Sequence, residues 1–278
     1  MAPSRLIIAP LVVLFLGFLY LTYEADEKYA FGMIVCGVAI AAVFSLSPQV
    51  NWQWYVRNPP DLEAPLRAVL ERFHGFYKSL EESEKLRFRQ RCALYIIATD
   101  FMPMTQDDDP VPEDLRLIVA SNAAQMLFGR EDLLLKKYEK VVLYPQLFPS
   151  PQFPNHFHSA EIFEEDGVIL LAAEPLMQGT FHFEEHFNVG MYALAQAFVS
   201  NFSTLEYPKT GDFLAENLEK ISGFSEKQIK DAVGLPEINW QAVSIGFFVL
   251  FSQRFSEYLP NEAAAYRKIF EENTFLKK

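Results

Sequence analysis

The segment His182-Phe183-Glu184-Glu185-His186 holds the residue types in this chain that are best suited to catalysis. It fits the pattern His-x-x-Glu-His, in which two histidines bind Zn²⁺ and the glutamate activates a metal-bound water. On a helix, His182 and His186 would share a face because they are four residues apart. However, phenylalanines surround the segment, and no acidic pair follows at the spacing that such enzymes use. Two interpretations of the segment therefore stay open: a zinc site formed by His182, Glu185 and His186, or a loop without a metal.

Other patterns for metal binding or catalysis are weaker. His156 and His158 lie in a Pro- and Phe-rich stretch from Phe148 to His158 and could join His182 and His186 around a metal. Asp107-Asp108-Asp109 is read as an acidic turn, because it lacks the glycine and distant glutamate of a calcium loop. No Gly-x-Ser-x-Gly or phosphate-binding loop occurs, and two cysteines are too few for a disulfide scaffold or a cysteine zinc module.

The composition describes a folded, acidic protein. The chain has 278 residues, 24 Lys+Arg against 36 Asp+Glu, a net charge of −12 and 50% hydrophobic residues. Nucleic acid is excluded as the main partner because phosphate binding needs clustered basic residues. Residues 1–60 are neutral, so the whole negative charge belongs to residues 61–278.

Two uncharged apolar runs near the start predict a transmembrane hairpin. They cover residues 6–22 and 29–46, and each is just long enough to cross a bilayer core. A signal peptide is the alternative for the first run, but no small-x-small cleavage site ends it. Arg5 and Arg57 flank the hairpin on one side and an acidic turn joins the runs on the other. The positive-inside rule then places the C-terminal part in the cytoplasm, at the inner or plasma membrane.

The rest of the chain predicts a mostly helical α+β domain. Two domains are expected: the hairpin at residues 1–57 and a soluble domain at residues 58–278. Short apolar runs at 140–145 and 167–171 read as strands. Helical patterns cover residues 62–97 (as a pair), 112–129, 188–202, 212–233, 239–255 and 261–270.

Several segments from about Phe88 to Phe270 resemble, in order, the Mlc-titration-factor-like (MtfA) zinc-dependent peptidases. These segments are Val119–Gly129, with its Ala-Ala-Gln sequence; Val142–Phe148, with its Tyr-Pro turn; Gly167–Gly179; Asn188–Met191; Ala242–Phe248; and Leu259-Pro260. The resemblance covers about two thirds of the chain and leaves out the hairpin. It implies a zincin-like fold of the gluzincin type.

The resemblance also implies where that family holds zinc. Its members carry HExxH on a helix, so that two histidines one turn apart bind Zn²⁺ beside a catalytic glutamate, and a glutamate on a later helix is the third ligand. Aligned here, the first histidine position is Tyr192, the glutamate is Ala193, the second histidine is Gln196 and the later ligand is Asn239. Ala193 cannot act as a base, and the other three are poor zinc ligands.

The sequence therefore predicts a membrane-anchored pseudopeptidase with a binding or regulatory role. No catalytic residue and no cofactor are expected, and zinc is implied by the resemblance alone. The expected partners are the lipid bilayer and a protein or peptide. One alternative is an active zinc metallopeptidase using His182, Glu185 and His186. Another is a structural subunit of a membrane complex, because Gly32, Gly37, Ala39, Ala41 and Ala42 give the second helix a small-residue face.

Overall fold

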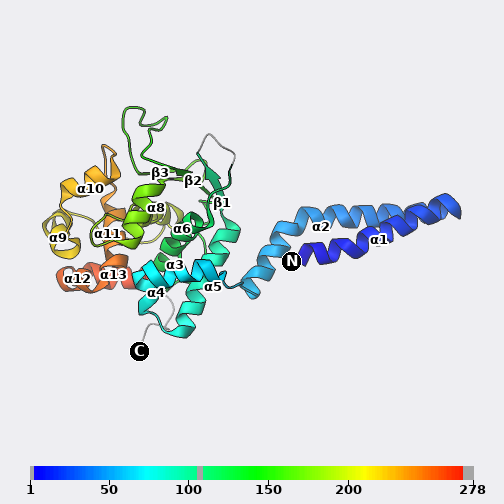
Figure 1. Cartoon of the computed structure of the whole chain (residues 1–278), viewed down its shortest axis with the longest axis horizontal. Coiled ribbons are helices and arrows are strands. Elements are labelled where there is room, and N and C mark those ends of the chain that lie inside the picture. Colours follow the sequence, from blue (N-terminus) through cyan, green and yellow to red (C-terminus); the bar gives the residue numbers. More distant parts are fainter. Residues whose placement is uncertain (1–2, 105–108, 272–278) are drawn as a thin grey trace. The chain divides into compact units, whose positions relative to one another are not determined.

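A computed structural model describes residues 3–104 and 109–271. The predicted acidic turn at Asp107–Asp109 lies mostly outside these residues. The chain divides into two compact units, Met1–Pro60 and Asp61–Lys278, and each is described by itself (Figure 1).

The first unit consists of two long apolar helices. They are α1 (Pro3–Glu24) and α2 (Ala30–Arg57), joined by the 3₁₀ helix η1 (Glu27–Tyr29). Both are long and apolar enough to cross a membrane. They pack against each other along the unit, which fits the predicted hairpin.

Small residues of α2 are what let the two helices approach. A Cβ added to Gly32 would come within 2.7 Å of the Phe18 ring, and one added to Gly37 would touch the Phe15 ring at 3.6 Å. The predicted small-residue face is therefore used, at these two glycines, within the hairpin. At the open end, the Ser4 backbone N–H donates to Oδ1 of Asn51 at 3.0 Å. This bond satisfies one of the N–H groups that the first turn of any helix leaves free.

Helix α2 continues eleven residues beyond the predicted end at residue 46. Pro48 lies inside it and cannot donate a hydrogen bond to the carbonyl of Phe44, four residues earlier. The Ser47 hydroxyl donates to that carbonyl at 2.7 Å instead. Because a neighbouring side chain satisfies the carbonyl, the proline does not end the helix.

The second unit is mostly helical with one small sheet, as predicted. Its strands are β1 (Asp100–Pro103), β2 (Lys140–Tyr144), β3 (Ala160–Phe163) and β4 (Val168–Ala172). Its helices are α3 (Ala64–Phe73), α4 (Gly75–Ser79), α5 (Glu82–Ala98), α6 (Glu113–Met126), α7 (Ala173–Phe181), α8 (Val189–Asn201), α9 (Asp212–Ser222), α10 (Glu226–Val233), α11 (Trp240–Leu250), α12 (Ser252–Tyr258) and α13 (Pro260–Phe270). The strand order is β1-β2-β4-β3; β1, β2 and β4 run parallel, and β3 is antiparallel to β4.

Three predicted helical stretches are divided in the structure. Residues 62–97 form three helices instead of a pair, because a short helix follows His74. Residues 212–233 break at Gly223, which has a φ of 83°, and the next helix starts with a capping box on Ser225. Residues 239–255 end as one helix at Leu250 and resume at Ser252. The strands β1 and β3 and helix α7 were not predicted.

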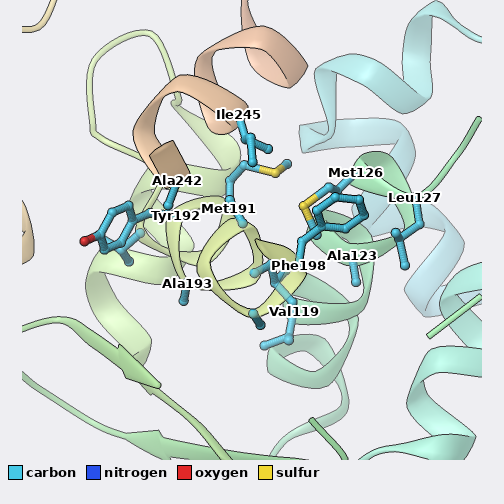
Figure 2. Packing of buried hydrophobic residues seen from close by; sticks show 14 of the residues in the cluster. Val119, Ala123, Met126, Leu127, Met191, Tyr192, Ala193, Phe198, Ala242 and Ile245 are labelled. Atoms are coloured by element: carbon cyan, nitrogen blue, oxygen red, sulfur yellow. The ribbon is translucent and has the colours of Figure 1, made fainter. Parts of the chain in front are cut away.

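Helix α8 lies at the centre of the hydrophobic core, packed against α6, α7, α11 and the sheet. Figure 2 shows α8 end-on, with Met191 between residues of α6 and α11 and with Tyr192 and Ala193 on other sides of the helix. Every residue from Val189 to Ala195 is buried. This helix contains no charged residue, which its buried position explains.

Candidate functional site

A chain of buried amides fixes the start of α8. Asn188 is its N-cap: Oδ1 accepts the Met191 N–H at 2.8 Å, and Nδ2 donates to Oδ1 of Asn122 on α6 at 2.8 Å. Nδ2 of Asn122 donates in turn to the Thr180 hydroxyl on α7 at 2.8 Å. All three side chains are buried and mutually satisfied. They set the position of the residues one turn further along α8.

The Tyr192 hydroxyl is the centre of the aligned zinc site. Its oxygen accepts the backbone N–H of Asn239 at 3.1 Å and Nε2 of Gln196 at 3.3 Å. Tyr192 is 1% exposed, and in Figure 2 its hydroxyl points away from the packed cluster. Three of the four aligned positions therefore meet at one oxygen, although Asn239 is 47 residues from Tyr192.

The side chains of Asn239 and Gln196 offer little to a cation. Asn239 is the N-cap of α11, and its Oδ1 accepts the Ala242 N–H at 3.0 Å. Oε1 of Gln196 is buried and has no hydrogen-bond partner among the described residues. Ala193, at the aligned glutamate position, is fully buried in the core. A methyl group cannot accept a proton, so no base stands at this position.

Electrostatics at the site also oppose a metal. Burial raises the pKa of the Tyr192 phenol above its usual range, and the hydrogen bond from Asn239 opposes that shift only in part. The phenol is therefore protonated at neutral pH, and two N–H donors already occupy its oxygen. Zinc needs deprotonated or imidazole ligands with free lone pairs. The residues present do not fit the zinc ion that the resemblance implies.

The segment His182–His186 forms a turn after α7 instead of a helix. The N–H groups of Glu185 and His186 both donate to the carbonyl of His182, at 2.9 and 2.8 Å. The side chains of His182, Glu185 and His186 are exposed. In the described part of the chain, no group of three or more His, Cys, Asp or Glu side chains is arranged to hold a metal.

The two histidines of the Pro-rich stretch lie in different environments. His156 is exposed, whereas His158 is fully buried, with Nε2 3.0 Å from Oε2 of Glu161 and Nδ1 donating to the carbonyl of His156. Both ring nitrogens of His158 are thus occupied. The structure uses this histidine to hold the loop between β2 and β3 onto the sheet.

Sequence reasoning missed the Asn122–Asn188–Thr180 bonds and the His158–Glu161 pair. The second had no strand-like signal, because His158 and Glu161 are three residues apart, whereas side chains on one face of a strand are two apart. The first had no local signal either, because the three residues come from three helices.

The model of the glucose-regulated metallo-peptidase M90 family matches residues 51–195, just over half of the chain. The match begins in α2 and ends within α8, so it includes Tyr192 and Ala193 and stops before Gln196. No curated protein matches the chain. The chain belongs to the glucose-regulated metallo-peptidase M90 family.

Proposed function

We propose that this protein is a membrane-anchored, catalytically inactive member of the M90 family that works by binding a protein or peptide partner. Family membership makes it a zinc-peptidase-like protein. The observation that carries the inactivity is the Tyr192 hydroxyl, which accepts two N–H donors at the centre of the aligned metal site. A protonated phenol that already accepts two N–H donors is a poor ligand for Zn²⁺, and the neutral amide oxygens of Gln196 and Asn239 are weak donors to it.

Zinc analysis tests this proposal. The full chain, purified in a neutral detergent and exchanged into metal-free buffer, is incubated with one equivalent of Zn²⁺, desalted and analysed by mass spectrometry for metal. We expect well under 0.1 Zn²⁺ per chain and no cleavage of casein. About one Zn²⁺ per chain, together with a peptidase activity that a chelator abolishes, would overturn the proposal. If that activity is lost in Glu185→Ala but kept in Glu184→Ala, the site is the one formed by His182, Glu185 and His186.

A rebuilt site tests the alignment itself. The fourfold variant Tyr192→His, Ala193→Glu, Gln196→His and Asn239→Glu would restore two histidines one turn apart and the later glutamate. We expect this variant to retain Zn²⁺ after desalting. A matched control keeps Tyr192 and carries the other three changes, and we expect it to retain none. A folded fourfold variant that holds no zinc would show that these positions are not the family's ligands.

The membrane anchor is the second part of the proposal. Its support is the pair of apolar helices, whose 22 and 28 residues correspond to about 33 and 42 Å of helix. Both exceed a hydrocarbon core of about 30 Å. We propose that the turn between them lies on the non-cytoplasmic side of the membrane and that Asp61–Lys278 lies in the cytoplasm, since Arg5 and Arg57 flank the hairpin.

Labelling of introduced cysteines tests this orientation. The two native cysteines, Cys36 and Cys92, are buried and provide a low background. In intact cells, a membrane-impermeant maleimide should label Ala25→Cys in the turn and should label Lys78→Cys only after lysis. The reverse pattern would contradict the proposed orientation, and a chain found in the soluble fraction would contradict the anchor.

A further inference from the structure

A groove of about 630 Å³ lies beside the start of α8, separate from the aligned zinc site. Its walls come from four places: the loop between β2 and β3, helix α7, the turn before α8 and the end of α10. Tyr192, Gln196 and Asn239 do not line it. Its volume is within the range of about 300–1,000 Å³ that is usual for ligand sites.

Two exposed apolar side chains of the loop line the groove, together with Gln146. Leu147 is 46% exposed and Phe157 is 65% exposed, and both line it. Burying two such side chains against a partner would remove a large apolar area from water. Neighbouring large apolar side chains that stay exposed are typical of binding surfaces.

Acidic side chains also line the groove. Glu174 on α7 and Asp231 on α10 line the groove and are exposed. Neither has an ion-pair partner among the described residues, and within that part of the chain no Lys or Arg lines the groove. His186 is the one further titratable side chain that lines it among the residues that the structure describes. The groove thus presents uncompensated negative charge next to apolar surface.

The walls are held in place by contacts inside the protein. The Ser159 N–H donates to the carbonyl of Val233 at 3.0 Å, and its hydroxyl donates to the carbonyl of Ala232 at 2.7 Å. Gly234 packs so closely that an added Cβ would lie 2.4 Å from the carbonyl oxygen of Phe157. These contacts join α10 to the loop that carries Phe157. A partner would therefore meet a surface that is already formed, which reduces the ordering cost of binding.

We infer that this groove binds a peptide segment of a partner protein in which an apolar side chain stands between lysines or arginines. The apolar side chain contacts Leu147 and Phe157, and the basic side chains pair with Glu174 and Asp231. The inference rests on the proposed binding function and names its partner class. It is argued from charge complementarity, since a net charge of −12 over the whole chain also attracts basic segments before they dock.

Fluorescence anisotropy tests the inference with the full chain in a neutral detergent. The probe is a fluorescein-labelled peptide, Lys-Leu-Lys-Phe-Arg, and its counterpart has glutamate at each basic position. We expect the basic peptide to bind at least tenfold more tightly. Glu174→Gln with Asp231→Asn should weaken its binding about five- to twentyfold, because two partly exposed ion pairs are lost, and Phe157→Ala should weaken it about tenfold.

Glu165→Gln with Asp166→Asn is the matched control, because it removes the same charge from an exposed turn between β3 and β4. We expect it to bind like the wild type. Equal weakening of binding in both double variants would show that only net charge matters and would overturn the assignment of the peptide to the groove. An unchanged affinity in the Glu174→Gln, Asp231→Asn variant would overturn it as well. A wild-type dimer that Phe157→Ala dissociates would assign the groove to a second copy instead. Zinc-dependent cleavage of the peptide would overturn the inactivity but leave the groove assignment standing.

Discussion

Replacing Tyr192 with phenylalanine removes one oxygen from the centre of the aligned metal site and leaves the ring in place. The structure gives this oxygen two donors, the Asn239 N–H at 3.1 Å and Nε2 of Gln196 at 3.3 Å. Each donor would lose its acceptor, and an unsatisfied buried donor costs about 1–3 kcal/mol. The Gln196 side chain is only half-buried, so water can compensate it in part. We therefore expect a loss of about 2 kcal/mol in the free energy of unfolding.

Near-UV circular dichroism of the full chain on heating measures this loss. For a unit of about 200 residues, each kcal/mol lowers Tm by about 2–4 °C, so Tyr192→Phe should unfold about 4–8 °C lower. Tyr258→Phe is a suitable control, because that ring is 41% exposed. A Tm within 1 °C of the wild type would refute the reasoning that the hydroxyl joins α8 to the start of α11. So would a wild-type Tm that rises by several degrees on adding Zn²⁺, since ligand binding stabilises the state that binds.

Three further predictions concern the rest of the molecule. Gly32→Leu should destabilise the hairpin by about 1–3 kcal/mol, because a Cβ there meets the Phe18 ring. Gly17→Leu should not, since nothing lies within 4 Å of its Cβ position. Resistance of the helix pair to SDS measures both variants, and equal losses of resistance would contradict the packing of Gly32 against Phe18. Gly234→Ala should lower the free energy of unfolding by more than Gly223→Ala does. The two glycines have nearly the same φ, 81° and 83°, but only at Gly234 would the added Cβ also meet a backbone oxygen. Equal losses of unfolding free energy in urea would contradict this. Burial, with Lys78 contributing, lowers the pKa of His74 from 6.5 to about 4. Between these pH values the unfolded chain binds a proton that the folded chain does not, so the free energy of unfolding should fall by up to about 3 kcal/mol as the pH drops from 6.5 to 4. A His74→Gln variant with the same pH dependence in urea titrations would refute this origin.

Much of the fold was legible because its signals are local. The strands at 140–145 and 167–171 are short apolar runs, and the helix starting at Asn188 has both an N-cap and an uncharged sequence. The break between α9 and α10 also has a local signal, a glycine followed by Ser225 and Gln228 in a capping box. This signal was overlooked, so one continuous helix was predicted there. The four-residue strands β1 and β3 carry no such pattern; they exist because β2 and β4 offer them hydrogen-bonding edges.

The candidate site divides in the same way. Tyr192 and Gln196 are four residues apart, so their shared face follows from helical geometry. That Asn239 joins them was obtained only through the family resemblance, since no local pattern links residues so distant in sequence. The groove could not be predicted at all, because its walls come from four segments that only the tertiary structure brings together.

The hydrogen bonds at Tyr192 also bear on how such a chain could change over evolutionary time. On the proposed function, a return to metal binding requires several substitutions, and at least two of them are expected to destabilise the fold when made alone. Tyr192→His by itself would remove the acceptor for Asn239 without completing a set of zinc ligands, and Ala193→Glu by itself would place an unpaired carboxylate in the core. Mutations that destabilise without restoring activity are removed by selection before the next can arise. If the proposed function holds, the Tyr192 hydroxyl therefore opposes a return to metal binding, and descendants of this chain are expected to diversify their binding surfaces while the aligned site stays closed.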